Sequence, residues 1–332
     1  MIISRTPFRL PLGGGGTDLP SYYREHGGFL VTAALDLHMN ICINQPVMLD
    51  QIKLNYSHVE CLNVEDLDHI KHDVVRETLK YLQWKKPVEI SSMADIASGT
   101  GLGSSSSYAV GLLNGLNSLL RRHVSVQELA EEACKIEMDL IGKPVGKQDQ
   151  YAAAFGGIIA LEIDRTGKVV VERLDLEKEF LAELQHRLMI FYTNIQRDAS
   201  EILAEQQTQI LKKDQHHSLE AMHKIKSIGL DIKEALQKGD IDSLGTLFHE
   251  HWLEKKRISS KMSSSKIDEW YDLARNNGAI GGKVMGAGGG GFFVFCCEQG
   301  KRKHLRATLE KAGLRYKQCS FNFEGSKIVG NF

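Results

Sequence analysis

The spacing of apolar side chains predicts a chain that contains both helices and strands. Apolar residues recur every three or four positions, the period of a helix with one buried face, over residues 109–120, 129–140, 199–213 and 219–237. Short apolar runs at Leu188–Tyr192 and Gly291–Cys297 have the length and composition of buried strands. Because these helices and strands do not alternate strictly, the pattern predicts the α+β fold class.

Two of the expected helices begin at recognisable signals. Ser125-Val-Gln-Glu128 is a capping box, whose serine and glutamate side chains satisfy free backbone N–H groups of a first helical turn. That helix is expected to end at Gly142-Lys-Pro144, because proline cannot continue a helix. The helix over 109–120 comes directly after Ser98–Ser107, a stretch of glycine and serine. A glycine-rich loop therefore opens this second helix.

The length and the charge bound the organisation of the protein. A chain of 332 residues predicts two domains, and we place their boundary in the charged stretch near residue 180, which gives domains 1–180 and 181–332. With 41 Lys and Arg against 42 Asp and Glu, the formal net charge is −1. The overall field then attracts neither nucleic acid nor an anionic membrane, so neither is expected as a partner.

The N-terminal segment and the cysteines favour a cytoplasmic protein. Arg5 and Arg9 interrupt the first apolar stretch and no small-residue cleavage site follows, so a secretory signal is not expected. The sequence has no run of 18 apolar residues. The six cysteines form no C-x-x-C pair and have no metal-site spacing to histidines, so we expect reduced thiols.

Glycine is the most informative residue, because 14 of the 31 glycines fall in three short clusters, at 13–16, 99–103 and 281–291. Such clusters mark places where the main chain approaches another group closely or adopts positive φ. The second cluster precedes a helix, and the free N–H groups of a loop and a first helical turn form a cradle for phosphate. The hydroxyls of Ser104–Ser107 could cap this helix, or reach a phosphate oxygen or Mg²⁺.

Familiar nucleotide motifs do not fit this cluster. Each Gly-Lys pair is followed by Pro, Gln, Val or Arg, so the P-loop sequence Gly-Lys-Ser/Thr is absent. The spacing is Gly-x-Gly-x-Gly, which differs from the dinucleotide fingerprint Gly-x-Gly-x-x-Gly. The protein-kinase sequences His-Arg-Asp and Asp-Phe-Gly are also missing.

Two acidic residues follow the glycine loop along the chain. Glu137 lies at the edge of the apolar stripe of the helix over 129–140. Its carboxylate could be solvated at the flank of the helix, or it could bind a metal ion. Asp149 lies in a stretch of small residues with Lys147 close by. It could cap the next helix, or accept a proton while Lys147 keeps it ionised.

Taken together, these motifs resemble those of the GHMP kinases, the superfamily of galactokinase, homoserine kinase, mevalonate kinase and phosphomevalonate kinase. Its first motif resembles Arg5–Asp18, its second matches Gly99–Ser107 and its third matches Lys283–Phe292, so the resemblance spans essentially the whole chain. It implies an N-terminal domain of the ribosomal protein S5 domain 2 type, a ferredoxin-like C-terminal domain, and an active site between them. The second motif usually begins with proline, and this chain has Ala97-Ser98 instead.

The resemblance also implies roles for individual residues. Asp149 would be the catalytic carboxylate with Arg9 near the reacting oxygen, Asp18 would bind sugar hydroxyls, and Ser105 and Glu137 would hold Mg²⁺. The co-substrate ATP would lie on the second motif, at Gly99, Gly101, Leu102, Gly103, Ser104, Ser105 and Ser106. Further substrate-binding positions would be Gly15, Gly16, Thr17, Arg197, Gly288 and Gly289.

One motif narrows the resemblance further. The four glycines before Thr17-Asp18, continued by Leu-Pro-Ser-Tyr-Tyr-Arg, resemble those of the heptose kinases that phosphorylate C1 of D-glycero-D-manno-heptose 7-phosphate. The implied product is the 1,7-bisphosphate, an intermediate toward nucleotide-activated heptose. A GHMP kinase for fucose, galactose or a mevalonate-type acid stays an alternative, as does a non-catalytic sugar- or nucleotide-binding homologue, although Asp149, Glu137 and Arg9 favour a catalyst.

A phosphorylated acceptor would bring a dianion that basic residues must match. Arg197, Lys143 and Lys147 are the candidates that the sequence offers near the motifs. The remaining clusters have plain interpretations: Arg121–His123 and Lys255–Arg257 as solvated surface, and His249-Glu-His251 as part of a helix without zinc.

Overall fold

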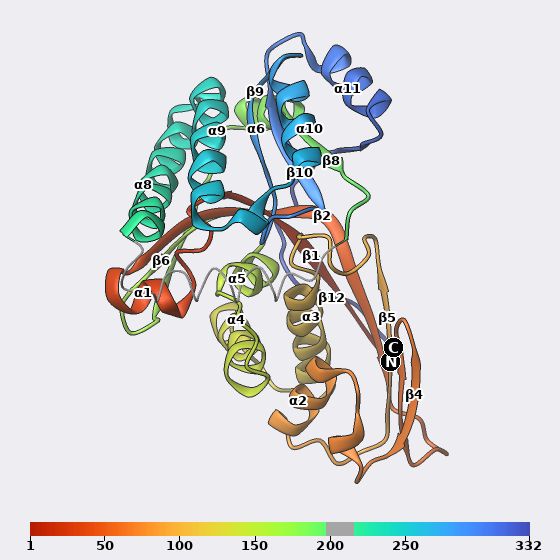
Figure 1. Cartoon of the computed structure of the whole chain (residues 1–332). Coiled ribbons are helices and arrows are strands. Elements are labelled where there is room, and N and C mark those ends of the chain that lie inside the picture. Colours follow the sequence, from red (N-terminus) through yellow and green to blue (C-terminus); the bar gives the residue numbers. More distant parts are fainter. Residues whose placement is uncertain (197–215) are drawn as a thin grey trace.

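The structure is a computed structural model that describes residues 1–196 and 216–332 (Figure 1). The helix expected over 199–213 and the candidate Arg197 lie outside the described residues. Within them, the strands form two sheets, and the mixture of helices and strands that the apolar pattern predicts is confirmed.

The larger sheet is built around two long neighbouring strands, β1 and β2, which pair antiparallel. Its strand order is β12-β1-β2-β5-β3-β4, with β6 beside the first half of β2 and β7 beside β6. The pair β3–β5 is parallel and the others are antiparallel. The strands are β1 (Ile2–Gly13), β2 (Gly28–Asn44), β3 (Gln51–Asn55), β4 (Val59–Asn63), β5 (Val88–Ala94), β6 (Ile158–Ile163), β7 (Val169–Arg173) and β12 (Lys327–Asn331).

Helices from the first half of the chain gather against this sheet, with α3 and α5 packed on β1 and β2 (Figure 1). The capping box at Ser125 is present, and helix α4 runs on into a π-helical turn, Lys135–Leu140. A 3₁₀ turn covers Leu67–His69. The helices are α1 (Pro20–His26), α2 (Asp73–Tyr81), α3 (Ser104–Leu119), α4 (Val126–Cys134) and α5 (Gln148–Phe155).

The smaller sheet has the antiparallel order β11-β8-β10-β9 and carries helices from the second half of the chain (Figure 1). Helix α9 packs on β9 and β10, while its partner α8 reaches back onto β1 and β2. The elements are α6 (Lys178–Arg187), β8 (Leu188–Tyr192), α8 (His216–Lys238), α9 (Ile241–Ile258), a 3₁₀ turn Ser260–Met262, α10 (Ser265–Arg275), β9 (Ala279–Val284), β10 (Phe292–Cys297), α11 (Arg302–Lys311) and β11 (Arg315–Gln318).

The two halves are joined more closely than the predicted domains 1–180 and 181–332 suggest. The last strand, β12, returns to the larger sheet beside β1, and the Met1 amino group donates to the Phe332 carbonyl at 2.8 Å. One continuous apolar core contains Leu10 and Leu161 of the larger sheet together with Ile190 and Val294 of the smaller one. The chain therefore crosses between the halves twice, and their relative position is held by a shared core.

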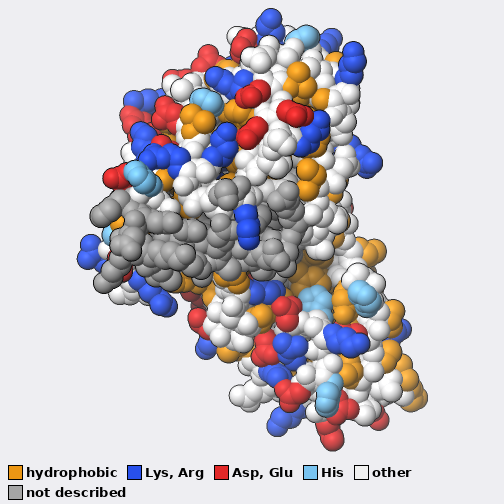
Figure 2. All heavy atoms as spheres, in the orientation of Figure 1, with side chains coloured by type: hydrophobic (Ala, Val, Ile, Leu, Met, Phe, Trp, Pro, Cys, Tyr) orange, Lys and Arg blue, Asp and Glu red, His pale blue; other side chains and the backbone are white. Residues whose placement is uncertain are grey.

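The surface agrees with the near-neutral charge. Blue and red side chains are interspersed over the face drawn in Figure 2, without a broad field of one sign.

Among the described residues, no helix has the length and apolar character that crossing a membrane requires.

Two glycine clusters meet backbone to backbone between the halves. Gly101 has φ +81° and Gly286 has φ +70°, and a Cβ at Gly286 would lie 2.7 Å from the Gly101 carbonyl oxygen. A Cβ at Gly291 would lie 2.2 Å from the carbonyl oxygen of Thr100. The loop 99–103 is thus held in place by direct main-chain contact with the loop 285–291, which explains why both sequences are rich in glycine.

This contact predicts a large loss of stability for Gly286→Ala. The added methyl group would meet the backbone of Gly101, which has no flexible side chain to move away. We expect the free energy of unfolding to fall by about 3 kcal/mol or more, measured by urea denaturation.

Gly300→Ala is the matched control, because Gly300 also has positive φ, +78°, but nothing lies within 4 Å of its added Cβ. Its loss should be only the cost of the backbone conformation, about 1 kcal/mol. Equal losses in the two variants would show that the contact between the loops does not constrain Gly286.

Candidate active site

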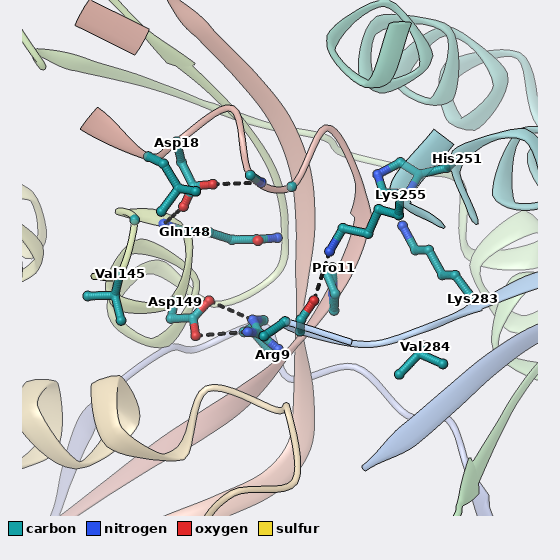
Figure 3. Close-up of a pocket in the computed structure, with 16 residues that line it drawn as sticks. Arg9, Pro11, Asp18, Val145, Gln148, Asp149, His251, Lys255, Lys283 and Val284 are labelled. Carbon is teal, nitrogen blue, oxygen red and sulfur yellow. Dashed lines mark hydrogen bonds and ion pairs between the residues drawn. The ribbon is translucent and has the colours of Figure 1, made fainter. Parts of the chain in front are cut away.

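A pocket lies between the two halves, and both of them line it (Figure 3). The first half contributes the end of β1, the glycines after it and the start of α5; the second half contributes α9, β9 and the glycine loop after β9. The polar side chains of the lining are Arg9, Asp18, Gln148, Asp149, His251, Lys255 and Lys283.

Arg9 and Asp149 form a two-pronged ion pair at the centre of the site. Arg9 Nε donates to Asp149 Oδ1 at 2.7 Å, and Nη2 donates to Oδ2 at 2.8 Å. The Arg9 side chain is 7 % exposed and that of Asp149 is 25 % exposed, so the carboxylate is the partner that a ligand can reach. Asp149 lies in the first turn of α5, where the helix dipole favours a negative charge.

The same arginine holds the glycine loop. Its Nη1 donates to the carbonyl of Gly101, and its backbone N–H donates to the Leu102 carbonyl at 3.1 Å. Lys147, which the sequence suggested as the partner of Asp149, instead donates to both carboxylate oxygens of Glu131 at 2.9 Å. Arg9 therefore pairs with Asp149 and at the same time fixes the distance of this carboxylate from the loop. Asp149 does not cap α5.

Asp18 lies beside the start of α5, on the same side of the pocket as Asp149, and is held by main-chain groups. Its Oδ1 accepts from the Gly16 N–H at 2.9 Å and its Oδ2 from the Gln148 N–H at 3.0 Å. Burial and the neighbouring Asp149 raise the pKa of Asp18, while these N–H donors oppose the shift. A Cβ at Gly146 would lie 2.0 Å from Asp18 Oδ2, so Gly146 is required for this fit.

The glycine loop 99–103 reaches the start of α3 with alternating positive φ angles, +74°, +81° and +77° at Gly99, Gly101 and Gly103. No side chain caps the helix. The hydroxyls of the serine run point elsewhere, since Ser107 Oγ donates to the Pro7 carbonyl and those of Ser105 and Ser106 donate to Glu137. The N–H groups of the first turn are therefore left for an anionic ligand.

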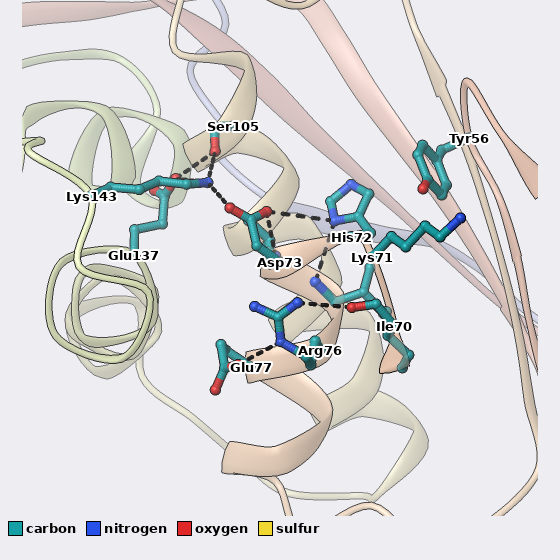
Figure 4. A network of polar contacts seen from close by, with 12 residues as sticks. Tyr56, Ile70, Lys71, His72, Asp73, Arg76, Glu77, Ser105, Glu137 and Lys143 are labelled. Atoms are coloured by element: carbon teal, nitrogen blue, oxygen red, sulfur yellow. Dashed lines mark hydrogen bonds and ion pairs between the residues drawn. The ribbon is translucent and has the colours of Figure 1, made fainter. Parts of the chain in front are cut away.

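Glu137 is fully buried in the π-helical turn below the start of α3 (Figure 4). Its carboxylate accepts from Ser105 Oγ and Ser106 Oγ, each at 2.6 Å, and from Gln150 Nε2 at 2.8 Å. Burial raises the pKa of Glu137, and these donors together with Lys143 oppose the shift. A carboxylate and two hydroxyls are hard oxygen donors, which fit Mg²⁺.

Lys143 completes this network. Its ammonium group lies 3.1 Å from Ser105 Oγ, 3.1 Å from Asp73 Oδ2 and 3.8 Å from Glu137 Oε1 (Figure 4). Lys143 thus belongs to the end of the site where the metal is expected, whereas the pocket in Figure 3 is lined by other residues.

Three basic residues of the second half line the pocket, and the sequence reading did not select them. The interpretation of Lys255 as solvated surface is wrong, because the period of α9 turns it inward with Phe248 and Trp252 while Lys256 and Arg257 face outward. Lys255 Nζ donates to the Gly286 carbonyl at 2.8 Å. Burial lowers the pKa of Lys255 to about 8 and lowers those of Lys283 and His251 as well.

Only some of the other residues expected to bind substrate line the pocket. Gly15 and Gly16 line the pocket. Thr17 is buried, and its hydroxyl oxygen lies 2.8 Å from the carbonyl oxygens of both Gly14 and Phe29, so it shapes the loop and does not face the pocket. From the third glycine cluster, Gly286 and Ala287 line the pocket. Gly288 and Gly289 are not among the described residues that line it. The N–H of Gly289 instead donates to the Met262 carbonyl at 2.8 Å.

Comparison with known families decides the identity of the fold. Residues 69–157 match the N-terminal domain of the GHMP kinases, and residues 232–314 match the C-terminal GHMP kinase domain. The chain belongs to the GHMP kinase family. The two-domain GHMP kinase fold expected from the three motifs is thereby confirmed.

Relatives of this GHMP kinase span its whole length. The D-glycero-alpha-D-manno-heptose 7-phosphate kinase of Campylobacter jejuni is 33% identical to it over 98% of each chain. The structure of a D-glycero-D-manno-heptose 1-phosphate kinase from Bacteroides thetaiotaomicron superposes with a TM-score of 0.82 at 26% identity and covers 100% of both chains. The galactokinase of Pyrococcus furiosus is 25% identical over 99% of this chain and 97% of its own.

These relationships make the protein an ATP-dependent phosphotransferase and a sugar kinase of the GHMP family. Its ligands are accordingly ATP and a sugar or sugar phosphate. The pocket between the halves brings together Asp18, Asp149 and Arg9, and Arg9 connects it to the glycine loop through the Gly101 carbonyl.

The buried ammonium group of Lys255 leads to a prediction about stability. Lys255→Met replaces this group by an apolar chain of similar length, so we expect a Tm at pH 7 equal to that of the parent or up to about 3 °C above it. In the folded protein the pKa of Lys255 is lowered to about 8 from 10.5. The buried charge therefore lowers the stability fully below pH 8, and this cost disappears as the pH rises toward 10.5. Any gain should therefore shrink between pH 8 and pH 10, measured by differential scanning fluorimetry.

Lys256→Met is the matched control, because the neighbouring ammonium is partly exposed and lies 3.1 Å from Asp268 Oδ1. It should change the Tm little at either pH. A Tm drop of several degrees in Lys255→Met alone would show that this ammonium stabilises the free protein.

Proposed function

We propose that this kinase transfers the γ-phosphoryl group of ATP to the anomeric hydroxyl of D-glycero-D-manno-heptose 7-phosphate and forms the 1,7-bisphosphate. One observation carries the proposal: the ion pair of Arg9 and Asp149 lies between the glycine loop 99–103 and the buried Asp18. A nucleotide on the loop and a sugar at Asp18 would both reach the Asp149 carboxylate. The name of the Campylobacter relative supports the choice of acceptor.

The acceptor side is formed by Asp18 and by backbone without side chains. Asp18 Oδ1 and Oδ2 each accept one main-chain N–H, and each keeps a lone pair for a sugar hydroxyl. Gly15, Gly16 and Gly146 line the pocket beside this carboxylate, and the missing side chain of Gly146 leaves the space that Asp18 occupies.

The nucleotide side uses main-chain groups and the site at Glu137. The N–H groups of Gly99–Ser106 bind the phosphates, and Ser105 and Glu137 would hold Mg²⁺. Bound Mg²⁺ supplies positive charge to the β- and γ-phosphate oxygens.

Asp149 positions the reacting hydroxyl. The hydroxyl oxygen attacks the γ-phosphorus, the bond from that phosphorus to the β–γ bridging oxygen breaks, and ADP leaves with the bonding electron pair. Asp149 accepts the hydrogen bond of the hydroxyl, and its carboxylate lines the pocket where it can take the proton. Arg9 holds the Asp149 carboxylate in place and adds positive charge beside the transferred group.

The role of Asp149 predicts a kinetic defect without a folding defect. Asp149→Asn retains the shape and one acceptor oxygen but cannot take a proton, so kcat should fall by about two to four orders of magnitude. A coupled assay of ADP release measures kcat. Calorimetry should show that the Kd for ATP is unchanged.

Asp139→Asn is the control, because Asp139 is an exposed carboxylate on the neighbouring π-helical turn. It should retain the kcat of the parent. An Asp149→Asn enzyme with turnover within tenfold of the parent would remove Asp149 from the chemical step.

The choice of acceptor is tested by comparing substrates that differ in one phosphate. We expect kcat/KM for heptose 7-phosphate to exceed that for the free heptose, galactose and fucose by at least about 100-fold, the effect of one strong charge-assisted contact. The same ADP-release assay gives all four values. Free galactose or fucose turning over as well as the heptose phosphate would overturn this acceptor and leave a sugar kinase of different specificity.

A further inference from the structure

One side of the pocket is formed by three basic residues that come from the second half of the chain. His251 and Lys255 lie one turn apart on α9, and Lys283 lies on β9. Their exposed fractions are 1 %, 7 % and 2 %, although all three line the pocket. We call these three residues the basic cluster; Figure 3 draws it together, across the pocket from Asp18 and Asp149.

The basic cluster lacks a structural counter-ion in the described part of the chain. The ammonium groups of Lys255 and Lys283 donate to the carbonyls of Gly286 and Leu12, and no described carboxylate forms an ion pair with either of them. Buried lysines are rarely left in this state, because taking an ammonium group out of water is costly without an anion.

His251 provides the second observation. Neither Nδ1 nor Nε2 has a hydrogen-bond partner among the described residues, although the ring is buried. Buried polar atoms are nearly always paired in a folded protein, and an orphaned ring at the wall of a pocket points to a group that a ligand supplies. The cluster thus offers unused N–H donors together with uncompensated positive charge.

The proposed function gives the nucleotide other partners. Its phosphates would meet the loop 99–103 and the start of α3, and the oxygens expected to hold the metal are at Ser105 and Glu137. The described pocket lining includes neither Ser105 nor Glu137, and the basic cluster lies on the α9 and β9 side of that pocket. The anion that fits the cluster is therefore one that comes with the other substrate.

We propose that His251, Lys255 and Lys283 bind the phosphate monoester that the acceptor sugar already carries. This inference rests on the proposed function, in that it takes the acceptor to be a sugar phosphate. A dianion here pairs with both ammonium groups and accepts from the His251 ring, while Asp18 binds hydroxyls across the pocket. The charge within the cluster then discriminates against an unphosphorylated sugar, which would leave these cations unpaired.

The main test is the preference for phosphorylated over unphosphorylated heptose, the ratio of the two kcat/KM values. In Lys255→Met and in His251→Leu we expect this ratio to fall at least about 20-fold, with the KM for ATP changed less than about twofold. Lys256→Met, on the same helix but paired with Asp268, should retain the ratio of the parent.

A binding measurement makes the result independent of turnover and of folding. Without nucleotide, heptose 7-phosphate should raise the Tm of the parent and of Lys256→Met, and it should raise that of Lys255→Met much less. The Tm of each protein without ligand shows whether it is folded. Inorganic phosphate serves as a second probe of the same groups.

The outcomes separate the inference from the proposed function. If the parent phosphorylates heptose 7-phosphate preferentially and Lys255→Met retains that preference, the basic cluster is not the phosphate site. If both acceptors slow equally and the KM for ATP rises, the cluster acts on the transferred γ-phosphoryl group and the inference is overturned. If the parent shows no preference and neither heptose 7-phosphate nor inorganic phosphate shifts its Tm, both proposals fail.

Discussion

The guanidinium group of Arg9 ties together the parts of the site that must stay in register. Arg9 belongs to β1, and its guanidinium group donates twice to Asp149 at the start of α5 and once to the carbonyl of Gly101 in the glycine loop. A planar fork with fixed donor positions allows little change in any of these distances. The Asp149 carboxylate is therefore set at a constant position relative to the glycine loop.

Glycine makes this arrangement possible because it lets main chain contact main chain. The loop around Gly101 touches the loop around Gly286, and Gly146 lets Asp18 approach the start of α5. In each case a Cβ would lie closer than a van der Waals contact to a backbone or carboxylate oxygen. Peptide groups without side chains therefore form much of these contacts, and they provide hydrogen-bond donors and acceptors with fixed directions.

The site contains two kinds of buried charge, which differ in their partners. The negative groups, Asp149 and Glu137, have partners within the protein and are preorganised for their roles. The positive groups on α9 and β9 have only carbonyls, and burial lowers their pKa values. The partners of the first kind offset the cost of burying those charges within the free protein, while the second kind carries a cost that a bound anion can offset.

The sequence by itself determined the elements with strong local signals. The strand expected at Leu188–Tyr192 has those limits in β8, and the helices after the glycine loop and after Ser125 are present because apolar period and capping are local properties. The family resemblance likewise named Arg9, Asp18 and Asp149 as site residues, and all three line one pocket. Only the tertiary structure decided the partner of Asp149, the return of β12 to the first sheet and the burial of Lys255, because each depends on which distant segment packs against it. Lys147 was the nearer cation along the chain, yet Arg9, 140 positions away, holds Asp149, because strand pairing and core packing, rather than separation along the chain, set distances in the fold.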